Sequence, residues 1–323
     1  MDYSNEFARH TAPAFRATIF HEPWWLDAVT QGDWCEARVN ANGKMVARLP
    51  YVMKRSMGIT ALGMPPLTHT LGPQLSLFET APGFHKPDHR ALLNELMGQL
   101  PRHDYFHQVC DPSIENTLPL YTLGYDSALT YTLRIEASQS TDITWQGIRP
   151  RIRQTIQKAQ KTFTLQYDLG IDEFCHFYNL NVKSNHKLSW SKNFERRANQ
   201  VKIRLYEACR AQDSGCLLAV RDEKNVLRAA IMLVWGHGVM FYFLTVHDAD
   251  PAGAGAIKLL IWEALKMAHA KRLTFDFDGF SRPEAVNILT GFGGDIRNRI
   301  AITKISPFLL FARTIKSKTR FAF

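Results

Sequence analysis

The feature that most limits the fold is an uncharged stretch of 18 residues, Ala229 to Val246. Its length is close to that of a membrane-spanning helix. However, Gly236-His237-Gly238 interrupts it, and it is rich in the β-branched and aromatic residues that favour strands. Two buried strands joined by a tight turn explain such a pattern better. We therefore expect a buried hairpin here and no stable membrane insertion.

Segments with helical and with strand-like patterns occur on both sides of this hairpin. The expected helices are 21–31, 87–100, 148–161, 171–184, 193–209, 256–270 and 283–290. The expected strands are 35–40, 45–54, 105–109, 129–135, 163–167, 216–220, 227–235, 239–246, 273–277 and 296–305. This order indicates a mixed α/β fold, and 323 residues suffice for two domains of about 150 residues each. We predict domains at 1–145 and 146–305 and a basic tail at 306–323.

The net charge of +9 belongs to the second half of the chain. Residues 1–150 contain 12 Lys/Arg and 15 Asp/Glu, whereas residues 151–323 contain 27 and 15. An anionic partner is therefore expected at the second half. Oligomeric state is left open, and a homo-oligomer is compatible with the sequence.

The cysteines and the N-terminus indicate a cytoplasmic protein without a metal site. None of the five cysteines forms a C-x-x-C pair, and the twelve histidines show no metal-ligand spacing. The first residues lack a basic region followed by an apolar stretch, so no signal peptide is predicted. No tightly bound cofactor is expected.

A glycine-containing segment, Asp250-Pro251-Ala252-Gly253-Ala254-Gly255-Ala256, lies between a predicted strand and a predicted helix. A helix N-terminus offers unpaired N–H groups and a positive dipole end, and small residues let a phosphate approach them. The alternative is a turn that simply tolerates glycine.

The order of elements around this segment resembles the GNAT acyltransferase superfamily. In that superfamily a Q/R-x-x-G-x-G/A turn after the fourth strand holds the pyrophosphate of acyl-coenzyme A (acyl-CoA). Gly253 and Gly255 match its glycines, while Asp250 stands where the family has Gln or Arg. The resemblance implies acyl-CoA as a co-substrate. The residues implied to bind it are Val246, His247, Gly253, Ala254, Gly255 and Ala256.

Several segments look like a narrower branch, the FemAB-like group, which has two GNAT-like domains in one chain. These are HEPWWLDAV (21–29), MPPLTHTLGP (64–73), RIRQTIQKAQK (151–161), FDFDGF (275–280) and GFGGDI (291–296). The group includes peptidyltransferases that build peptidoglycan bridges from aminoacyl-tRNA. The first half has His85-Lys86-Pro87-Asp88 before its helix and no G-x-G. Two tandem GNAT-like domains are therefore expected, with the donor site only in the second.

Acyl transfer to an amine requires a base, and Asp276 and Asp278 are the first candidates. Residues two apart on a strand face the same side, and neighbouring carboxylates can raise one pKa. The alternative is that Asp276 is a hydrogen-bonded structural residue and Asp278 caps a turn. Tyr242 and His247 are further candidates. Many relatives carry a tyrosine acid four residues before a Gly-Phe pair, where this chain has Asn287.

The predicted helix 148–161 carries five basic and no acidic residues between Arg149 and Lys161. We consider Arg149, Arg153 and Lys158 as phosphate-binding residues for a nucleotide-linked acceptor, for coenzyme A or for tRNA. A solvated helix face is the alternative. His69, in a loop framed by prolines and a glycine, is a candidate for shaping an acceptor pocket.

Three hypotheses follow for the function. The first is an acyltransferase that uses acyl-CoA and an amine acceptor, such as a sugar or a cell-envelope precursor. The second keeps the fold and uses aminoacyl-tRNA as the donor. The third is a catalytically silent module that binds phosphate or a membrane surface.

Overall fold

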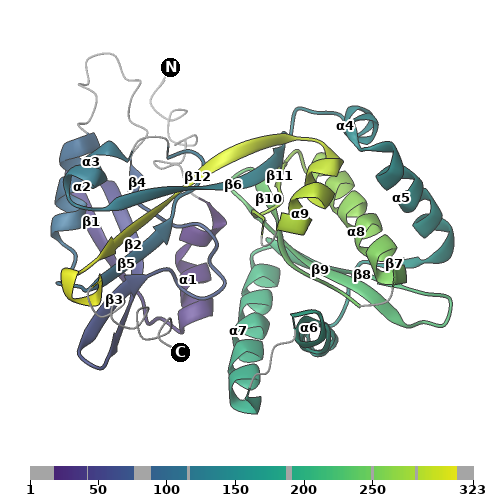
Figure 1. Cartoon of the computed structure of the whole chain (residues 1–323), viewed down its shortest axis with the longest axis horizontal. Coiled ribbons are helices and arrows are strands. Elements are labelled where there is room, and N and C mark those ends of the chain that lie inside the picture. The colour runs from purple at the N-terminus through teal and green to yellow at the C-terminus, as the bar shows by residue number, and fades with distance from the viewer. Residues whose placement is uncertain are drawn as a thin grey trace, which may run out of the picture. The chain divides into compact units, whose positions relative to one another are not determined.

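The computed structural model describes residues 18–41, 43–75, 89–114, 117–186, 191–248, 251–280 and 283–310. They form two compact units, whose elements are labelled in Figure 1. Unit 1 contains the described parts of residues 1–22, 32–129 and 299–323, and unit 2 those of 23–31 and 130–298. Each unit therefore combines several stretches of chain, which differs from the contiguous division expected from the sequence. Strands β6 (Asp126–Ile135) and β12 (Asp295–Ile305) contain residues of both units.

Unit 1 is built on strands in the order β1-β2-β3-β5-β12. The strand bounds are β1 (Cys35–Ala41), β2 (Lys44–Ser56), β3 (Ile59–Gly63) and β5 (Tyr105–Val109), and β4 (Gln74–Leu75) pairs with β2. The helical elements are η1 (Ile19–His21), α2 (His89–Gly98) and α3 (Leu118–Thr122). Their apolar side chains, including Leu49, Leu96 and Phe106, form one core.

Unit 2 contains strands in the order β6-β11-β10-β9-β8-β7. The bounds are β7 (Thr164–Gln166), β8 (Gly215–Arg221), β9 (Leu227–Gly236), β10 (Val239–His247) and β11 (Thr274–Asp276). The helices are α1 (Pro23–Thr30), α4 (Thr141–Gly147), α5 (Pro150–Thr162), α6 (Ile171–His186), α7 (Lys192–Ala211), α8 (Pro251–Ala270) and α9 (Pro283–Leu289), followed by the 3-10 helix η2 (Thr290–Phe292). The mixed α/β fold predicted from the sequence is confirmed.

The uncharged stretch forms the hairpin of β9 and β10, as predicted. Gly236 pairs with Val239, and both turn residues have positive φ, 51° at His237 and 78° at Gly238. Such backbone angles match the right-handed twist of the flanking strands. The hairpin is buried because helices cover both faces of the sheet. Helices α5 and α8 lie on one face and α6 and α7 on the other (Figure 1).

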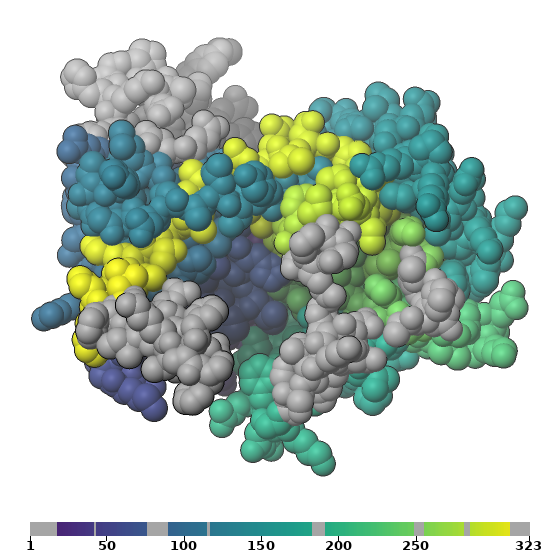
Figure 2. All heavy atoms as spheres, in the orientation of Figure 1, coloured from purple at the N-terminus to yellow at the C-terminus, as the bar shows by residue number. Residues whose placement is uncertain are grey.

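Successive side chains of the strands in unit 2 point to opposite faces of the sheet, and both faces are buried beneath helices. Cys216, Leu218 and Val220 of β8 join the core beneath α5 and α8. Leu217 and Ala219, which alternate with them, are buried as well and face the opposite layer. The polar side of α5 remains on the molecular surface, where Figure 2 shows it in teal at the right.

Gly294 lets β12 begin close to β6, because a Cβ there would lie 2.5 Å from the main-chain oxygen of Arg134. Gly293 is a matched control. Both glycines have positive φ, +90° and +84°, but a Cβ at Gly293 would lie 3.4 Å from its nearest neighbour, the oxygen of Gly147.

We predict that both alanine substitutions destabilise the protein and that Gly294→Ala does so more. The backbone strain costs about 1–3 kcal/mol in either variant. The clash in Gly294→Ala adds about 1–3 kcal/mol, because a strand backbone moves less easily than a side chain. Urea denaturation measures both changes in the free energy of unfolding. Equal decreases in the free energy of unfolding for the two variants would contradict the close approach of β12 to β6.

Candidate active site

Strands β10 and β11 run side by side for three residue pairs and then separate. Their parallel pairing ends at Phe241 and Asp276, whereas β10 continues to pair with β9 as far as His247. Beyond that point Phe277 donates its N–H to Leu133 of β6, at 2.9 Å. An irregularity in the β9–β10 register between Tyr242 and Leu244 coincides with the separation. The main-chain groups of β10 beyond Phe241 thus extend past the end of the β11 pairing.

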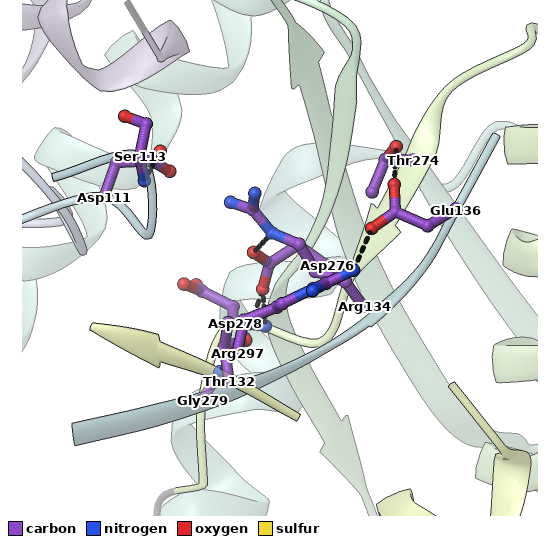
Figure 3. A network of polar contacts seen from close by, with 10 residues as sticks. All are labelled: Asp111, Ser113, Thr132, Arg134, Glu136, Thr274, Asp276, Asp278, Gly279 and Arg297. Atoms are coloured by element: carbon purple, nitrogen blue, oxygen red, sulfur yellow. Dashed lines mark hydrogen bonds and ion pairs between the residues drawn. The ribbon is translucent and has the colours of Figure 1, made fainter. Parts of the chain in front are cut away.

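A buried ion pair holds β11 at the point of separation (Figure 3). Asp276 is fully buried, and its Oδ2 accepts a hydrogen bond from Nε of Arg134 at 2.7 Å. Its Oδ1 accepts from the hydroxyl of Thr132 and from the N–H of Asp278, the latter at 2.7 Å. The same Thr132 hydroxyl accepts the N–H of Gly279 at 3.1 Å. Strand β6 therefore fixes both the end of β11 and the turn that follows it.

The predicted same-face arrangement of Asp276 and Asp278 is wrong. Strand β11 ends at Asp276, and Asp278 has φ of 60°, in the left-handed region. The chain turns there because the carboxylate of Asp276 captures the N–H of Asp278. Asp276 thus has the contacts of a hydrogen-bonded structural residue, which was the alternative to a catalytic role. A catalytic role for either aspartate stays a prediction.

The other two candidate bases lie on β10. Tyr242 is buried, and its hydroxyl donates to Oγ1 of Thr245 at 2.8 Å. Burial raises the pKa of Tyr242, so the phenolate form is disfavoured near neutral pH. His247, at the end of β10, has Nδ1 2.7 Å from the carbonyl oxygen of Asp248. Because a carbonyl only accepts, Nδ1 carries a proton, and in the neutral ring Nε2 is the basic nitrogen.

The predicted glycine turn is in fact the first part of a helix. Helix α8 begins at Pro251, so Gly253, Ala254, Gly255 and Ala256 are helical residues. Asp250 lies outside the described residues. A Cβ at Gly255 would lie 3.7 Å from Cγ2 of Thr155, which places the start of α8 against α5.

Two of the predicted donor-binding residues have buried side chains, so they would offer only main-chain groups to a donor. Val246 and Ala256 are buried in the apolar core, so their side chains pack rather than bind. The first turn of α8 contains no acidic residue, so the positive end of its dipole is not neutralised within the helix. A role of the start of α8 in phosphate binding stays a prediction.

Two of the arginines predicted to bind phosphate, one just before α5 and one within it, form hydrogen bonds to other helices instead. Arg149 donates from its main chain to the oxygen of Gly291 at 2.8 Å and from Nη1 to that of Asn287 at 3.2 Å. Arg153 reaches the oxygens of Trp145 and Gln146 at 3.5 and 3.4 Å. Arginines in these positions satisfy terminal carbonyls of α9 and α4. Their role in substrate binding stays a prediction, as does that of Lys158, which is exposed on α5.

Two other cations face each other where α5 meets the start of α8. Arg151 precedes Thr155 by one turn on α5, and Lys258 follows Gly255 by one turn on α8. Burial, and next the positive charge of Arg151, lower the pKa of Lys258. Within the described residues, neither cation has an acidic partner. Like charges held together in this way favour an anion between them.

His69 belongs to unit 1, whereas the residues described above belong to unit 2. It is half-buried, and its ring lies 5.8 Å from that of Phe20. Its loop is well anchored, because the main chain of Gly72 donates to Gln108 at 2.9 Å and that of Leu71 to Val109 at 2.7 Å. A role in acceptor binding stays a prediction.

Neither a metal site nor a membrane span is found in the part of the chain that the structure describes. No group of three or more metal-ligating side chains occurs there. None of the helices there is both long and apolar enough to cross a membrane.

Comparison with known proteins agrees with this geometry. Residues 146–281 match the family model of the acetyltransferase (GNAT) domain. Comparison with curated protein sequences gives no match. Among solved structures, FemX is 10% identical with a TM-score of 0.67, covering 92% of this chain and 94% of its own.

Two further structures share the architecture. L-PGS from Bacillus licheniformis is 11% identical with a TM-score of 0.50, covering 93% of this chain and 96% of its own. A tandem GNAT protein from the clavulanic acid biosynthesis pathway is 12% identical with a TM-score of 0.51, covering 87% of both chains. At such identities, the likenesses establish the fold.

The matched family model identifies residues 146–281 as a GNAT-type acetyltransferase domain, and this segment contains the separating strands and the helix that begins beside them. The chain as a whole shares the fold of FemX and of the tandem GNAT protein, as its segments predicted. These findings favour the two enzymatic hypotheses over a catalytically silent module.

Sequence reasoning missed three residues of this region, Thr132, Arg134 and Lys258. The first and second are isolated polar residues in a strand, and only the pairing of β6 with β11 shows what they bind. A signal for Lys258 existed. It is the only charged residue in the 12 residues from Pro251 to Trp262, the first three turns of α8.

We predict that Asp276→Asn lowers the free energy of unfolding by about 3–5 kcal/mol, because it leaves the mostly buried Arg134 without its counter-charge. Asp278→Asn is the matched control and should cost less than about 1 kcal/mol, since asparagine tolerates the left-handed conformation. Urea denaturation of both variants checks this. If Asp278→Asn is as destabilising as Asp276→Asn, the structural assignment of Asp276 is wrong.

Proposed function

We propose that unit 2 transfers an acyl group from acyl-CoA to an amine acceptor. The observation that carries this proposal is the separation of β10 from β11 beside the start of α8. An extended pantetheine chain would lie along β10 where β11 leaves it, as peptides do at sheet edges. The helix start offers N–H groups to the pyrophosphate at one end of that chain.

The donor's phosphates would lie between the first turn of α8 and the cations Arg151 and Lys258. The helix supplies main-chain N–H groups, and the two side chains supply full charges. Coenzyme A has a pyrophosphate and a 3′-phosphate, so the main-chain N–H groups and the cationic side chains would each have a phosphate to bind. Gly255 of α8 lies against Thr155 of α5, so the two helices are in contact beside both cations.

The transfer needs no covalent enzyme intermediate. The neutral amine attacks the thioester carbonyl, the carbon–nitrogen bond forms, the carbon–sulfur bond breaks, and the thiolate leaves. Main-chain N–H groups of β10 beyond Phe241 would stabilise the oxyanion that develops. The proton lost by the amine ends on the thiolate or in solvent, since Asn287 cannot act as the acid.

The base that deprotonates the amine is assigned first to His247. Its neutral ring presents Nε2 as the basic nitrogen, because Nδ1 donates to the main chain. Asp278 is the second candidate. The acceptor is proposed to be an amine on a sugar or a cell-envelope precursor, with Lys158 as a candidate contact in unit 2. The variants His247→Gln and Asp278→Asn would separate the two bases, because only loss of the true base removes the low-pH limb of the rate profile.

We predict that Lys258→Glu weakens the binding of coenzyme A at least about tenfold. The substitution replaces an attraction for phosphate by a repulsion. It should not destabilise the fold, because the new carboxylate would face Arg151 and remove a like-charge contact. Isothermal titration with coenzyme A, together with urea denaturation, measures both effects.

The control is Lys161→Glu, which makes the same change of net charge near the far end of α5. It should bind coenzyme A as the unchanged protein does. If both variants bind with unchanged affinity, the proposed phosphate position is wrong. Absence of coenzyme A binding by the unchanged protein would overturn the donor itself.

A second candidate donor is aminoacyl-tRNA. The exposed cations of α5, Arg151, Lys158 and Lys161, favour it, because no acidic residue of that helix neutralises them. Filter binding with charged tRNA at several salt concentrations tests it, since each phosphate contact with a single strand contributes about 0.7 to the logarithmic salt slope. A slope near zero, or no binding, would exclude tRNA.

A further inference from the structure

Arg228 connects the ends of three neighbouring strands in unit 2. It is the second residue of β9, and its guanidinium binds one aspartate on each side. Nε and Nη2 donate to Oδ2 of Asp222 at 2.9 and 2.8 Å, and Nη1 donates to Oδ2 of Asp248 at 2.8 Å. Asp222 directly follows β8, and Asp248 directly follows β10. We refer to these three residues as the Arg228 bridge.

Each aspartate of the Arg228 bridge is itself held by the main chain. Oδ1 of Asp222 accepts the N–H groups of Lys224 and Val226 at 2.9 and 2.8 Å, which fixes the turn between β8 and β9. The N–H of Asp248 donates to the main-chain oxygen of Arg228 at 3.0 Å. The side chains are mostly shielded, with 22% of Arg228, 15% of Asp222 and 18% of Asp248 exposed. The bridge is therefore a fixed arrangement of partly buried charges.

The position of the bridge is what links it to the donor. Asp248 is separated from Pro251, the first residue of α8, by two residues. Its Oδ1 is buried and, within the described residues, has no hydrogen-bond partner. Leaving an acceptor unsatisfied opposes stability by about 1–3 kcal/mol. The carboxylate thus keeps one oxygen that its ion pair with Arg228 does not use.

We propose that Arg228 is a positioning residue of the donor site, which holds Asp248 and thereby the start of α8 where the phosphates of the donor bind. This inference rests on the proposed function. Arg228 itself does not touch the donor. Its guanidinium holds Asp248 at the end of β10, and two residues separate Asp248 from the first residue of α8.

Both hydrogen-bonded aspartates raise the pKa of Arg228, with Asp248 the larger cause. Hydrogen bonds, first that from the N–H of Val226, lower the pKa of Asp222. The ion pair between Arg228 and Asp222 is thus charged throughout the range in which an acyltransferase would work. A pH change near neutrality is not expected to open it.

The test compares Arg228→Ala with Arg221→Ala. Arg221 ends β8 and donates to Glu173 at 2.6 Å, to Gln166 at 2.8 Å and to the main-chain oxygen of Asn225 at 3.2 Å, so it holds the same turn but does not contact Asp248. Titration calorimetry measures the affinity for coenzyme A, thermal denaturation measures stability, and steady-state kinetics separate the KM for acyl-CoA from kcat.

We expect Arg228→Ala to raise the Kd for coenzyme A and the KM for acyl-CoA about tenfold, while kcat changes less than about twofold, because only the binding geometry is altered. Arg228→Lys, which keeps a charge but lacks the planar guanidinium that gives two hydrogen bonds to Asp222 and one to Asp248, should be intermediate. Arg221→Ala should leave the Kd unchanged. A purely structural role would lower the melting temperature of both alanine variants and leave both Kd values unchanged, which would overturn the inference.

Asp248→Asn provides the second variant if Arg228→Ala does not fold. It keeps the shape of the side chain and removes the charge of the pair, so a rise in Kd of a few fold is expected. An unchanged Kd would again overturn the inference. If the unchanged protein fails to bind coenzyme A, the proposed function fails, which is a distinct result from equal binding by the variants.

Discussion

The buried ion pair between Arg134 and Asp276 is the interaction on which the candidate site depends. It fixes the end of β11 to β6 and so determines where β11 stops following β10. A charged pair in an apolar interior contributes little net stability, but removing one partner is costly. Its contribution is therefore geometric, since it determines where the pairing of β11 with β10 ends beside the start of α8.

Charge in unit 2 has two distinct uses. Some arginines are bound to the protein itself, as Arg149 and Arg153 are to helix ends and Arg228 is to two aspartates. Others, notably Arg151 and Lys258, lack acidic partners among the described residues and lie where two helices meet. The excess positive charge of the second half thus divides into structural contacts and a small area that can bind an anion.

Much of the fold could be predicted from the sequence, and less of the site. The hairpin around Gly238 was evident because an uncharged run with a glycine turn has few alternatives. The start of α8 was misplaced, because small residues around Gly253 fit both a turn and a helix. The geometry of Asp276 and Asp278 was also misjudged, since the alternation rule assumes a strand and this strand ends at Asp276. No local sequence pattern shows that Arg134 lies on the strand next to Asp276.

Hydrogen–deuterium exchange of the main chain, with and without acetyl-coenzyme A, tests the central claim most directly. If the donor lies where β10 leaves β11, added acetyl-coenzyme A slows the exchange of amides in residues 242–256 and leaves those of β8 unchanged. Protection that is absent from residues 242–256, or that occurs only in unit 1, would contradict this account.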